Sequence, residues 1–316
     1  MLKTIIQILF FILLTFTNSI CFAQQNSIDS AIGGPILPIT LIDIAGPRPV
    51  IEYLINSKNA TSVIHSNASF YIHLNLQNSK YFGIEDLVEN GQFGISEPGK
   101  INTKYKAKIN EIKIENLIIK NKEVSIFETY PPYKEGFGML GIQWIKENKI
   151  ILDYCNNKVA IQPNKSQQDS IAKKLLNDNY ISIPIQIDET SNRYYTEVVI
   201  NNQKTKFLIG TVAKLFIDSA YAEVANIEIG DTLGIFGGPT GETGYVYNSK
   251  ENFTIKIGAF ETITNAAIED TYKYSNKKRP DNISELIGGT LGAEFMIKNK
   301  IVIDFGNLTL YLKLNR

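Results

Sequence analysis

The chain has 316 residues, and its 32 Lys and Arg balance its 32 Asp and Glu, so the formal net charge is +0. Without a basic patch or an acidic tail, this balance argues against nucleic-acid binding and gives no support for binding to a membrane surface. The length suits two domains, each large enough to bury its own hydrophobic core.

The first 23 residues predict a cleaved signal peptide. A basic start at Lys3 precedes an apolar stretch, residues 4–16, that is too short to span a bilayer comfortably, and small residues up to Ala23 fit a cleavage site. No later stretch approaches the roughly 20 apolar residues of a membrane span. We therefore expect export to the periplasm or the cell exterior. An uncleaved membrane anchor and lipid attachment at Cys21 are the alternatives.

The mature chain is expected to derive its stability from packing and not from disulfide bonds. After signal cleavage Cys155 is the only cysteine that remains, so no internal disulfide can form. The position of Cys155 in a strand-to-turn stretch favours an inert thiol over a nucleophile.

Taken in chain order, the rest of the sequence predicts short strands rich in β-branched and aromatic residues and separated by Asn, Gly and Lys clusters, as in an all-β protein. We expect strands at residues 50–55, 107–119 (bulged or divided in two), 180–187, 195–200, 207–209, 253–257 and 308–314. We expect short helices at residues 166–176 and, capped by Asp218, at residues 219–224. The expected organisation is an N-terminal lobe at 24–165, a linker at 166–179 and a C-terminal lobe at 180–316.

The second half of the chain repeats the first. Gly138-Met139-Leu140-Gly141, followed by the strand-like residues 150–154, recurs 151 residues later (289 − 138) as Gly289-Thr290-Leu291-Gly292 and residues 301–305. Upstream, residues 55–68 match residues 200–213 with an offset of 145 (200 − 55). Such a repeat indicates two structurally equivalent halves.

These motifs resemble the two-domain aspartic peptidases, of the pepsin-like or fused retropepsin-like type, over about residues 48–314. In that family each half carries two apolar residues and then Asp-Thr/Ser-Gly on a tight loop. A Gly-Leu-Gly turn, a short helix and a strand similar to Val302-Ile303-Asp304-Phe305 follow. The resemblance implies two similar β-barrel-like lobes with a cleft between them, and we expect no cofactor.

Both catalytic aspartates of the family are replaced. The matching positions are His65 in the first half and Gly210 in the second. The family mechanism needs two carboxylates close enough to share one proton, one acting as base on a water and the other as acid. Since neither His65 nor Gly210 is a carboxylate, we expect no catalytic residue at these positions.

The next two positions of each loop point to a scaffold that persists. Ser66 and Thr211 keep the hydroxyl that, in the family, braces the two loops against each other. Asn67 and Val212 stand where the family has glycine. Asn tolerates a left-handed backbone, whereas β-branched Val does not do so easily. These four residues, together with His65 and Gly210, form the expected floor of the cleft.

Other polar residues favour structural roles. A lone histidine such as His65 is more often a hydrogen-bonded structural residue than a general base, and its spacing to His73 matches no recognised metal site. Asp218 is expected to cap a helix. Asp153 and Asp304 occupy matching places on the two closing strands, outside the active site of the family. We therefore expect no metal.

The glycine-rich stretch 234–247 lacks the spacing and the Lys-Ser/Thr ending of a phosphate-binding loop. A hairpin beside the cleft fits it better, with residues 90–94 as its counterpart in the first half. The family uses such a hairpin as a flap over the substrate, and Gly94, Gly238 and Gly241 are the flap candidates.

The sequence thus predicts an exported, inactive, monomeric aspartic-peptidase-like protein. It would bind a peptide or similar extended ligand in the cleft, by strand addition to the flap. One alternative is an active aspartic endopeptidase that uses Asp43, Asp188 or Asp231. The other is a structural surface protein whose cleft binds nothing.

Overall fold

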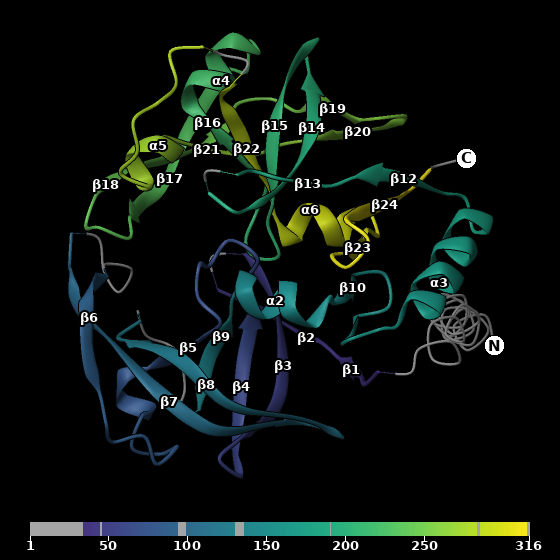
Figure 1. Ribbon diagram of the computed structural model, residues 1–316. Coiled ribbons are helices and arrows are strands. Elements are labelled where there is room, and N and C mark those ends of the chain that lie inside the picture. The colour runs from purple at the N-terminus through teal and green to yellow at the C-terminus, as the bar shows by residue number, and fades with distance from the viewer. Residues whose placement is uncertain are drawn as a thin grey trace, which may run out of the picture.

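The computed structural model describes residues 34–44, 46–93, 99–129, 136–189, 191–282 and 285–314. Within them the chain forms mostly short strands, in three sheets, with few and short helices. Two lobes lie one above the other, joined by a sheet at one side (Figure 1). The predicted all-β fold with two similar lobes is confirmed. The expected signal peptide lies outside the described residues, among which no helix is long and apolar enough to cross a membrane.

The N-terminal lobe is built on a curled eight-stranded sheet with the order β2-β3-β4-β9-β5-β8-β7-β6, in which β3 also pairs with β7. Its strands are β2 (Thr40–Asp43), β3 (Pro47–Ile55), β4 (Lys58–Ile64), β5 (Ile72–Asn75), β6 (Val88–Phe93), β7 (Asn102–Ile114), β8 (Leu117–Phe127) and β9 (Phe137–Leu140). The expected strand at 107–119 is therefore divided in two. The break falls at a turn in which Glu115 has a φ of 49°.

The C-terminal lobe contains a ten-stranded sheet with the order β17-β18-β21-β16-β22-β15-β14-β19-β20, to which β13 adds by pairing with β14. Its strands are β13 (Gln186–Ile187), β14 (Tyr194–Ile200), β15 (Gln203–Ile209), β16 (Phe216–Asp218), β17 (Ile229–Gly237), β18 (Thr243–Ser249), β19 (Phe253–Ile257), β20 (Phe260–Thr264), β21 (Ala267–Glu269) and β22 (Ile287–Leu291). Two short helices, α4 (Ser219–Val224) and α5 (Thr271–Tyr274), belong to this lobe.

The same strand crossing occurs in each lobe. In the first, β9 lies between β4, to which it is parallel, and β5, to which it is antiparallel; in the second, β22 lies in the same way between β15 and β16. The first glycine of each Gly-Leu-Gly turn sits at this crossing. A side chain on Gly138 would overlap the backbone oxygen of His73, and one on Gly289 would overlap that of Phe216. Only glycine permits this close approach of two backbones.

A third sheet joins the lobes, with the order β1-β11-β10-β23-β24-β12. Its strands are β1 (Ile36–Pro38), β11 (Lys158–Ala160), β10 (Ile151–Asp153), β23 (Val302–Asp304), β24 (Thr309–Lys313) and β12 (Tyr180–Pro184). At its centre Leu152 of β10 lies opposite Ile303 of β23, its own equivalent 151 residues later (303 − 152). The pseudo-twofold axis that relates the halves therefore passes through this pair.

Three more helices follow the repeated turns or connect the two lobes. The equivalent helices α2 (Ile142–Asn148) and α6 (Ala293–Lys298) follow the two Gly-Leu-Gly turns and bury Trp144 and Phe295. The longer α3 (Lys165–Asn177) connects β11 to β12, close to the expected helix at 166–176. It begins at a capping box in which Asn164 and Gln167 bind each other's backbone N–H groups.

Candidate functional site

The loops that follow β4 and β15 meet on the pseudo-twofold axis. The backbone N–H of Ser66 donates to Thr211 Oγ1 (2.8 Å), and the N–H of Thr211 donates to Ser66 Oγ (3.1 Å). Each hydroxyl also donates into the opposite lobe, Ser66 Oγ to the carbonyl of Ile209 and Thr211 Oγ1 to that of Ile64, both at 2.6 Å. Both side chains are fully buried. We call this reciprocal set of hydrogen bonds between Ser66 and Thr211 the brace; it fixes the two loops, and so the two lobes, against each other.

His65 and Gly210 come directly before the brace and occupy equivalent positions. His65 N–H donates to the carbonyl of Leu140 (2.8 Å), and Gly210 N–H donates to that of Leu291 (2.9 Å). A Cβ on Gly210 would lie only 2.6 Å from Cγ2 of Thr290. The two positions that match the family aspartates are thus side by side at the floor, and the second has no room for a side chain unless Thr290 moves.

The imidazole of His65 is neutral, and no carboxylate of the described residues forms a hydrogen bond with it. Burial of the ring, followed by the positive charges of Arg48 and Arg193, lowers its pKa to about 3. Its Nδ1 is buried without a hydrogen-bond partner among the described residues. A group with so low a pKa is a weak base near neutral pH, and no orienting acid assists it. The floor therefore carries no counterpart of a proton-sharing acid pair.

The residues after the brace differ from the expectation. Neither Asn67 nor Val212 has a positive φ; the left-handed residue of the second loop is Ala213, with a φ of 64°. Val212 instead points into an apolar cluster of the opposite lobe that includes Val63 and Met139. The difficulty that a left-handed backbone would cause for β-branched Val212 therefore does not arise, because the smaller Ala213 is the left-handed residue. Asn67 remains beside the cleft floor, and its Oδ1 is buried without a partner among the described residues.

Two arginines that the sequence analysis missed act on His65 through their charges. Arg48 at the start of β3 and Arg193 just before β14 are equivalent residues, 145 positions apart (193 − 48). Each follows a turn closed by an aspartate five residues earlier: Asp43 Oδ1 accepts from Gly46 N–H (3.0 Å), and Asp188 Oδ2 accepts from Ser191 N–H (2.8 Å).

A sequence signal for these arginines exists. Ile42-Asp43, four residues and Arg48 recur as Ile187-Asp188, four residues and Arg193, at the same offset of 145 as the floor residues. This motif lies upstream of the matching segments 55–68 and 200–213. Asp43 and Asp188, two of the alternative catalytic aspartates, are thereby identified as turn-forming residues.

The other acidic candidates are also engaged elsewhere. Asp231, the third alternative, is exposed on β17. Asp218 caps α4 through Ala220 N–H (3.1 Å) and forms an ion pair with Arg279 (3.2 Å). Burial raises its pKa, and Arg279 opposes that shift.

Asp153 and Asp304 are buried in equivalent turns. Each carboxylate accepts hydrogen bonds from a nearby backbone N–H and from an asparagine side chain, Asn156 in the first half and Asn307 in the second. These contacts give both aspartates the structural role that was expected.

His73 lies away from the floor, in the interior of the N-terminal lobe. Its Nε2 is 3.1 Å from the carbonyl oxygen of Phe127, and the two rings are 3.8 Å apart. Burial lowers its pKa to about 3. His73 and His65 therefore do not converge on a common ligand, and the described residues contain no cluster of His, Cys, Asp or Glu that could hold a metal ion.

Both glycine-rich stretches form hairpins, β6–β7 in the first lobe and β17–β18 in the second, and their tips meet (Figure 1). A Cβ on Gly241 would lie 2.9 Å from Cγ1 of Ile101, and one on Gly99 would lie 3.9 Å from Cγ2 of Thr243. At the base of the second tip, Gly238 packs against the backbone of Tyr274. Gly94 lies outside the described residues. Each lobe thus contributes one hairpin to a contact above the floor.

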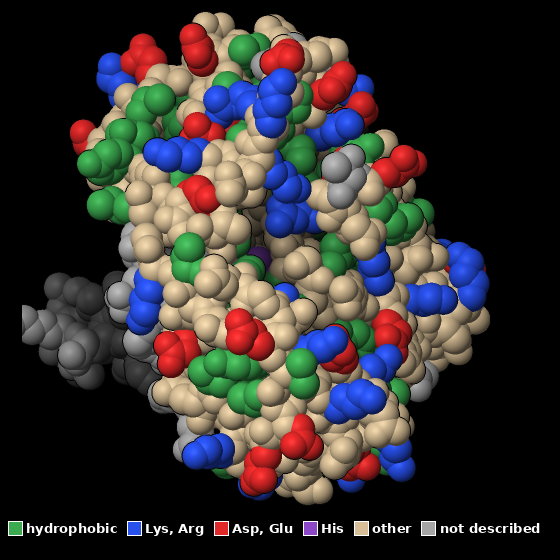
Figure 2. All heavy atoms as spheres, turned by 60° about the vertical axis from the view of Figure 1, so that its left-hand side comes forward, with side chains coloured by type: hydrophobic (Ala, Val, Ile, Leu, Met, Phe, Trp, Pro, Cys, Tyr) green, Lys and Arg blue, Asp and Glu red, His purple; other side chains and the backbone are tan. Residues whose placement is uncertain are grey.

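Between floor and hairpins, the surface is hollowed. Figure 2 shows this hollow between the lobes, with a histidine at its bottom and Lys or Arg side chains beside it. Burial and the charge of Glu269 raise the pKa of Tyr274, while the charges of Arg193 and Arg48 lower it. Tyr274, His65 and the two arginines therefore share one electrostatic environment in the cleft.

No protein-family model matches the chain, and neither does any curated protein sequence. Among solved structures it is similar to conglutin gamma, a basic 7S globulin from lupine seeds, at 10% identity and a TM-score of 0.47, over 89% of this chain and 95% of that one. A basic 7S globulin from soybean matches at 10% identity and a TM-score of 0.44, with the same coverage. At this similarity the fold assignment depends on the duplicated topology, the brace and the central sheet of the chain itself.

Proposed function

We propose that the protein is an exported, monomeric, non-catalytic relative of the aspartic peptidases that binds an extended peptide in the cleft between its lobes. One observation carries the proposal. The two positions that would hold the catalytic carboxylates are an imidazole and a glycine, and the charges that act on that imidazole are arginines. The brace next to them is intact, so the cleft keeps its framework without its acid pair.

The available groups do not suit peptide hydrolysis. Activation of a water by this fold needs one ionised and one protonated carboxyl group at the same place. Asp43 and Asp188 accept hydrogen bonds within their own turns, and Asp231 is exposed on a hairpin strand. An active peptidase would have to recruit one of these three aspartates by a rearrangement of the loops.

The surroundings of the floor suit an extended chain. Each hairpin ends its sheet, so β6 and β17 are edge strands with backbone groups available for pairing. The touching tips cover the floor from above. A peptide that lies between hairpins and floor would exchange backbone hydrogen bonds with the edges and be held along its length.

The test of inactivity is incubation of the purified mature protein with denatured casein between pH 3 and 7, with and without a general aspartic peptidase inhibitor. Pepsin serves as the positive control. We expect no inhibitor-sensitive cleavage at any pH. Cleavage that the inhibitor abolishes, and that substitution of Asp43 or Asp188 by Asn also abolishes, would establish an active enzyme and overturn the proposal.

A further inference from the structure

The cleft places two like charges from the two lobes around one axis. Arg48 and Arg193 are related by the same offset as Ser66 and Thr211, so each lobe contributes one arginine at the same position. The residue before each arginine contacts the opposite lobe: Pro47 accepts a hydrogen bond from Ala213 N–H (2.9 Å), and Asn192 accepts one from Lys146 Nζ (3.0 Å). The charges of both arginines act on His65 and on Tyr274. We call these two residues the arginine pair. Two guanidinium groups that share a partly buried site repel each other, and this arrangement favours an anion between them.

Little within the described residues compensates these charges. Arg48 donates through Nε to the carbonyl of Ile44 (2.7 Å), which leaves its terminal nitrogens available. The side chain of Arg193 has no hydrogen bond or ion pair to any described residue, and burial lowers its pKa. Asp188 lies near enough to act on Arg193, but its carboxylate accepts hydrogen bonds from the backbone and the hydroxyl of Ser191.

We propose that the arginine pair binds a carboxylate of the peptide that occupies the cleft, either an acidic side chain or the free C-terminus. The inference rests on the proposed function and names the ligand's chemistry. The planar guanidinium presents donors in a fork that matches the two oxygens of a carboxylate. Next to it, the neutral ring of His65 and the amide of Asn67 each have a buried polar atom without a partner among the described residues. An arriving carboxylate thus meets the guanidinium donors and His65 Nδ1, which donates in one tautomer, whereas Oδ1 of Asn67 can only accept a hydrogen bond and does not contribute.

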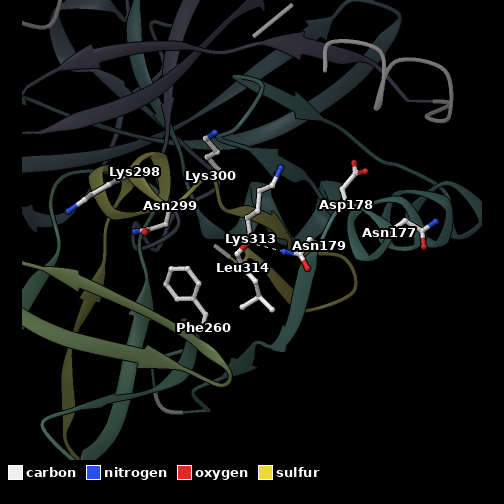
Figure 3. A pocket seen from close by; sticks show the side chains of 9 residues that line it. All are labelled: Asn177, Asp178, Asn179, Phe260, Lys298, Asn299, Lys300, Lys313 and Leu314. Carbon is white, nitrogen blue, oxygen red and sulfur yellow. Dashed lines mark hydrogen bonds between the residues drawn. The ribbon is translucent and has the colours of Figure 1, made fainter. Parts of the chain in front are cut away.

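A second basic pocket of the protein does not offer this geometry. It measures about 570 Å³ and lies beside the central sheet, lined by Lys298, Lys300 and Lys313. Figure 3 shows that the amine of Lys298 points away from those of Lys300 and Lys313, so the three do not converge on one point. Lys298 reaches the carbonyl of Ile263 (3.4 Å), and Lys313 lies over the ring of Tyr180. Lys298 therefore supplies a matched control for loss of one positive charge.

The experiment selects binders from a library of random peptides with free C-termini, displayed against the mature protein. A selected peptide is then compared, by isothermal titration calorimetry, with two variants of itself. In one, each Glu or Asp is replaced by Gln or Asn; in the other, the C-terminus is amidated. We expect selected peptides to be enriched in acidic residues or in one C-terminal pattern. One of the two variants should bind about 10- to 100-fold more weakly, which identifies the source of the carboxylate.

The protein variants are Arg48→Gln, Arg193→Gln and Arg193→Lys, with Lys298→Gln as the control. Each glutamine variant should lose about the same 10- to 100-fold in affinity, Arg193→Lys should lose less, and the control should bind as the wild type does. Since the bond of Arg48 to Ile44 is the one hydrogen bond that either arginine side chain makes with the described residues, melting temperatures should show that all variants are folded. A double variant, Arg48→Gln with Arg193→Gln, should bind the selected peptide and its more weakly bound neutral variant with equal affinity.

The outcomes separate the two proposals. If peptides bind in the cleft but their neutral variants bind equally well, or if both arginine variants bind as the wild type does, the carboxylate site is wrong and the peptide-binding function stands. If no peptide is selected, the proposed function is overturned, and the inference falls with it.

Discussion

The two lobes are alike at the brace and unlike one residue before it. Ser66 and Thr211 make the same hydrogen bonds across the axis, whereas His65 presents a ring at a position where Gly210 presents bare backbone. The brace uses only hydroxyl groups, backbone N–H groups and carbonyls. It therefore does not depend on the side chain that precedes it. At this floor Ser66 and Thr211 hold the two loops together, whereas the positions of His65 and Gly210 are those that would supply catalytic groups. The hydrogen bonds of the brace can therefore persist when the catalytic groups are absent.

The largest expected effect concerns the hairpins, which are the other place where the lobes meet. In a Cys155→Ser background, Gly99→Cys with Thr243→Cys should form a disulfide, because a Cβ on Gly99 lies 3.9 Å from the Thr243 side chain. The oxidised protein should bind a selected peptide more than about 100-fold more weakly, since the locked tips close the way to the floor.

Reduction of that disulfide should restore binding, and the Gly99→Cys single variant controls for strain at its φ of 78°. Equal binding by the oxidised and reduced forms, with the bond verified by mass spectrometry, would mean that ligands do not pass between the hairpins.

The brace should come next in size. Thr211→Val leaves the N–H of Ser66 and the carbonyl of Ile64 buried without a partner. The free energy of unfolding should fall by about 3 kcal/mol, and Ser66→Ala should cost a similar amount because its bonds are the equivalents. Urea denaturation measures both, with the exposed Thr232→Val as control. A large cost in one lobe and none in the other would contradict a symmetric brace.

A smaller effect on stability distinguishes Gly210 from His65, the equivalent positions at which the two lobes differ. Gly210→Ala should destabilise the protein by about 1–3 kcal/mol, because the new methyl group meets Cγ2 of Thr290. Thr290→Ser removes that Cγ2 atom and should restore most of the loss, whereas His65→Ala needs no such compensation. Thermal melting of the single and double variants checks this. No rescue by Thr290→Ser would show that another contact limits the position.

The smallest effect is electrostatic. Arg193→Gln should raise the pKa of His65 from about 3 by up to about one unit, because one of two repelling charges is removed. His73 should not respond, since the charge that acts on it is that of Lys104. Proton NMR of the two histidines during a pH titration measures both shifts. Equal shifts would mean that the arginine pair does not act selectively on the floor.

The same pKa values give a direction for stability. The pKa of both histidines is about 6.5 in the unfolded chain and about 3 in the folded one, so between these values the unfolded state binds more protons. The histidines thus contribute stability above pH 6.5 that is lost as the pH falls towards 3. Glu269 acts in the opposite sense, because burial raises its folded pKa to about 7.

Much of the fold could be read from local pattern. The strand at 253–257 and the helix at 219–224 agree with the structure, because alternation and the Asp218 cap are set by neighbouring residues. The shift of the left-handed residue from Val212 to Ala213 was not predictable, because it depends on an apolar cluster of the other lobe.

The arginine pair could have been predicted from the sequence, since its motif repeats with the same offset of 145 residues as the floor residues. The sequence pattern of one lobe does not determine its distance from the other lobe. The contact of the hairpin tips, and the joint effect of the Arg48 and Arg193 charges on the pKa of His65, follow only when the halves are placed together.

The pairing of β10 with β23 has a consequence for how the chain is assembled. It is the only strand pairing between the halves among the described residues, and it sets Leu152 against its own counterpart, as an isologous interface does in a homodimer. The protein is thus organised as two subunits that happen to share one polypeptide. A cut within α3 should leave two fragments that bind each other. One substitution in the β10–β23 pair, at Leu152 or at Ile303, should lower the stability of the protein by half as much as both substitutions together.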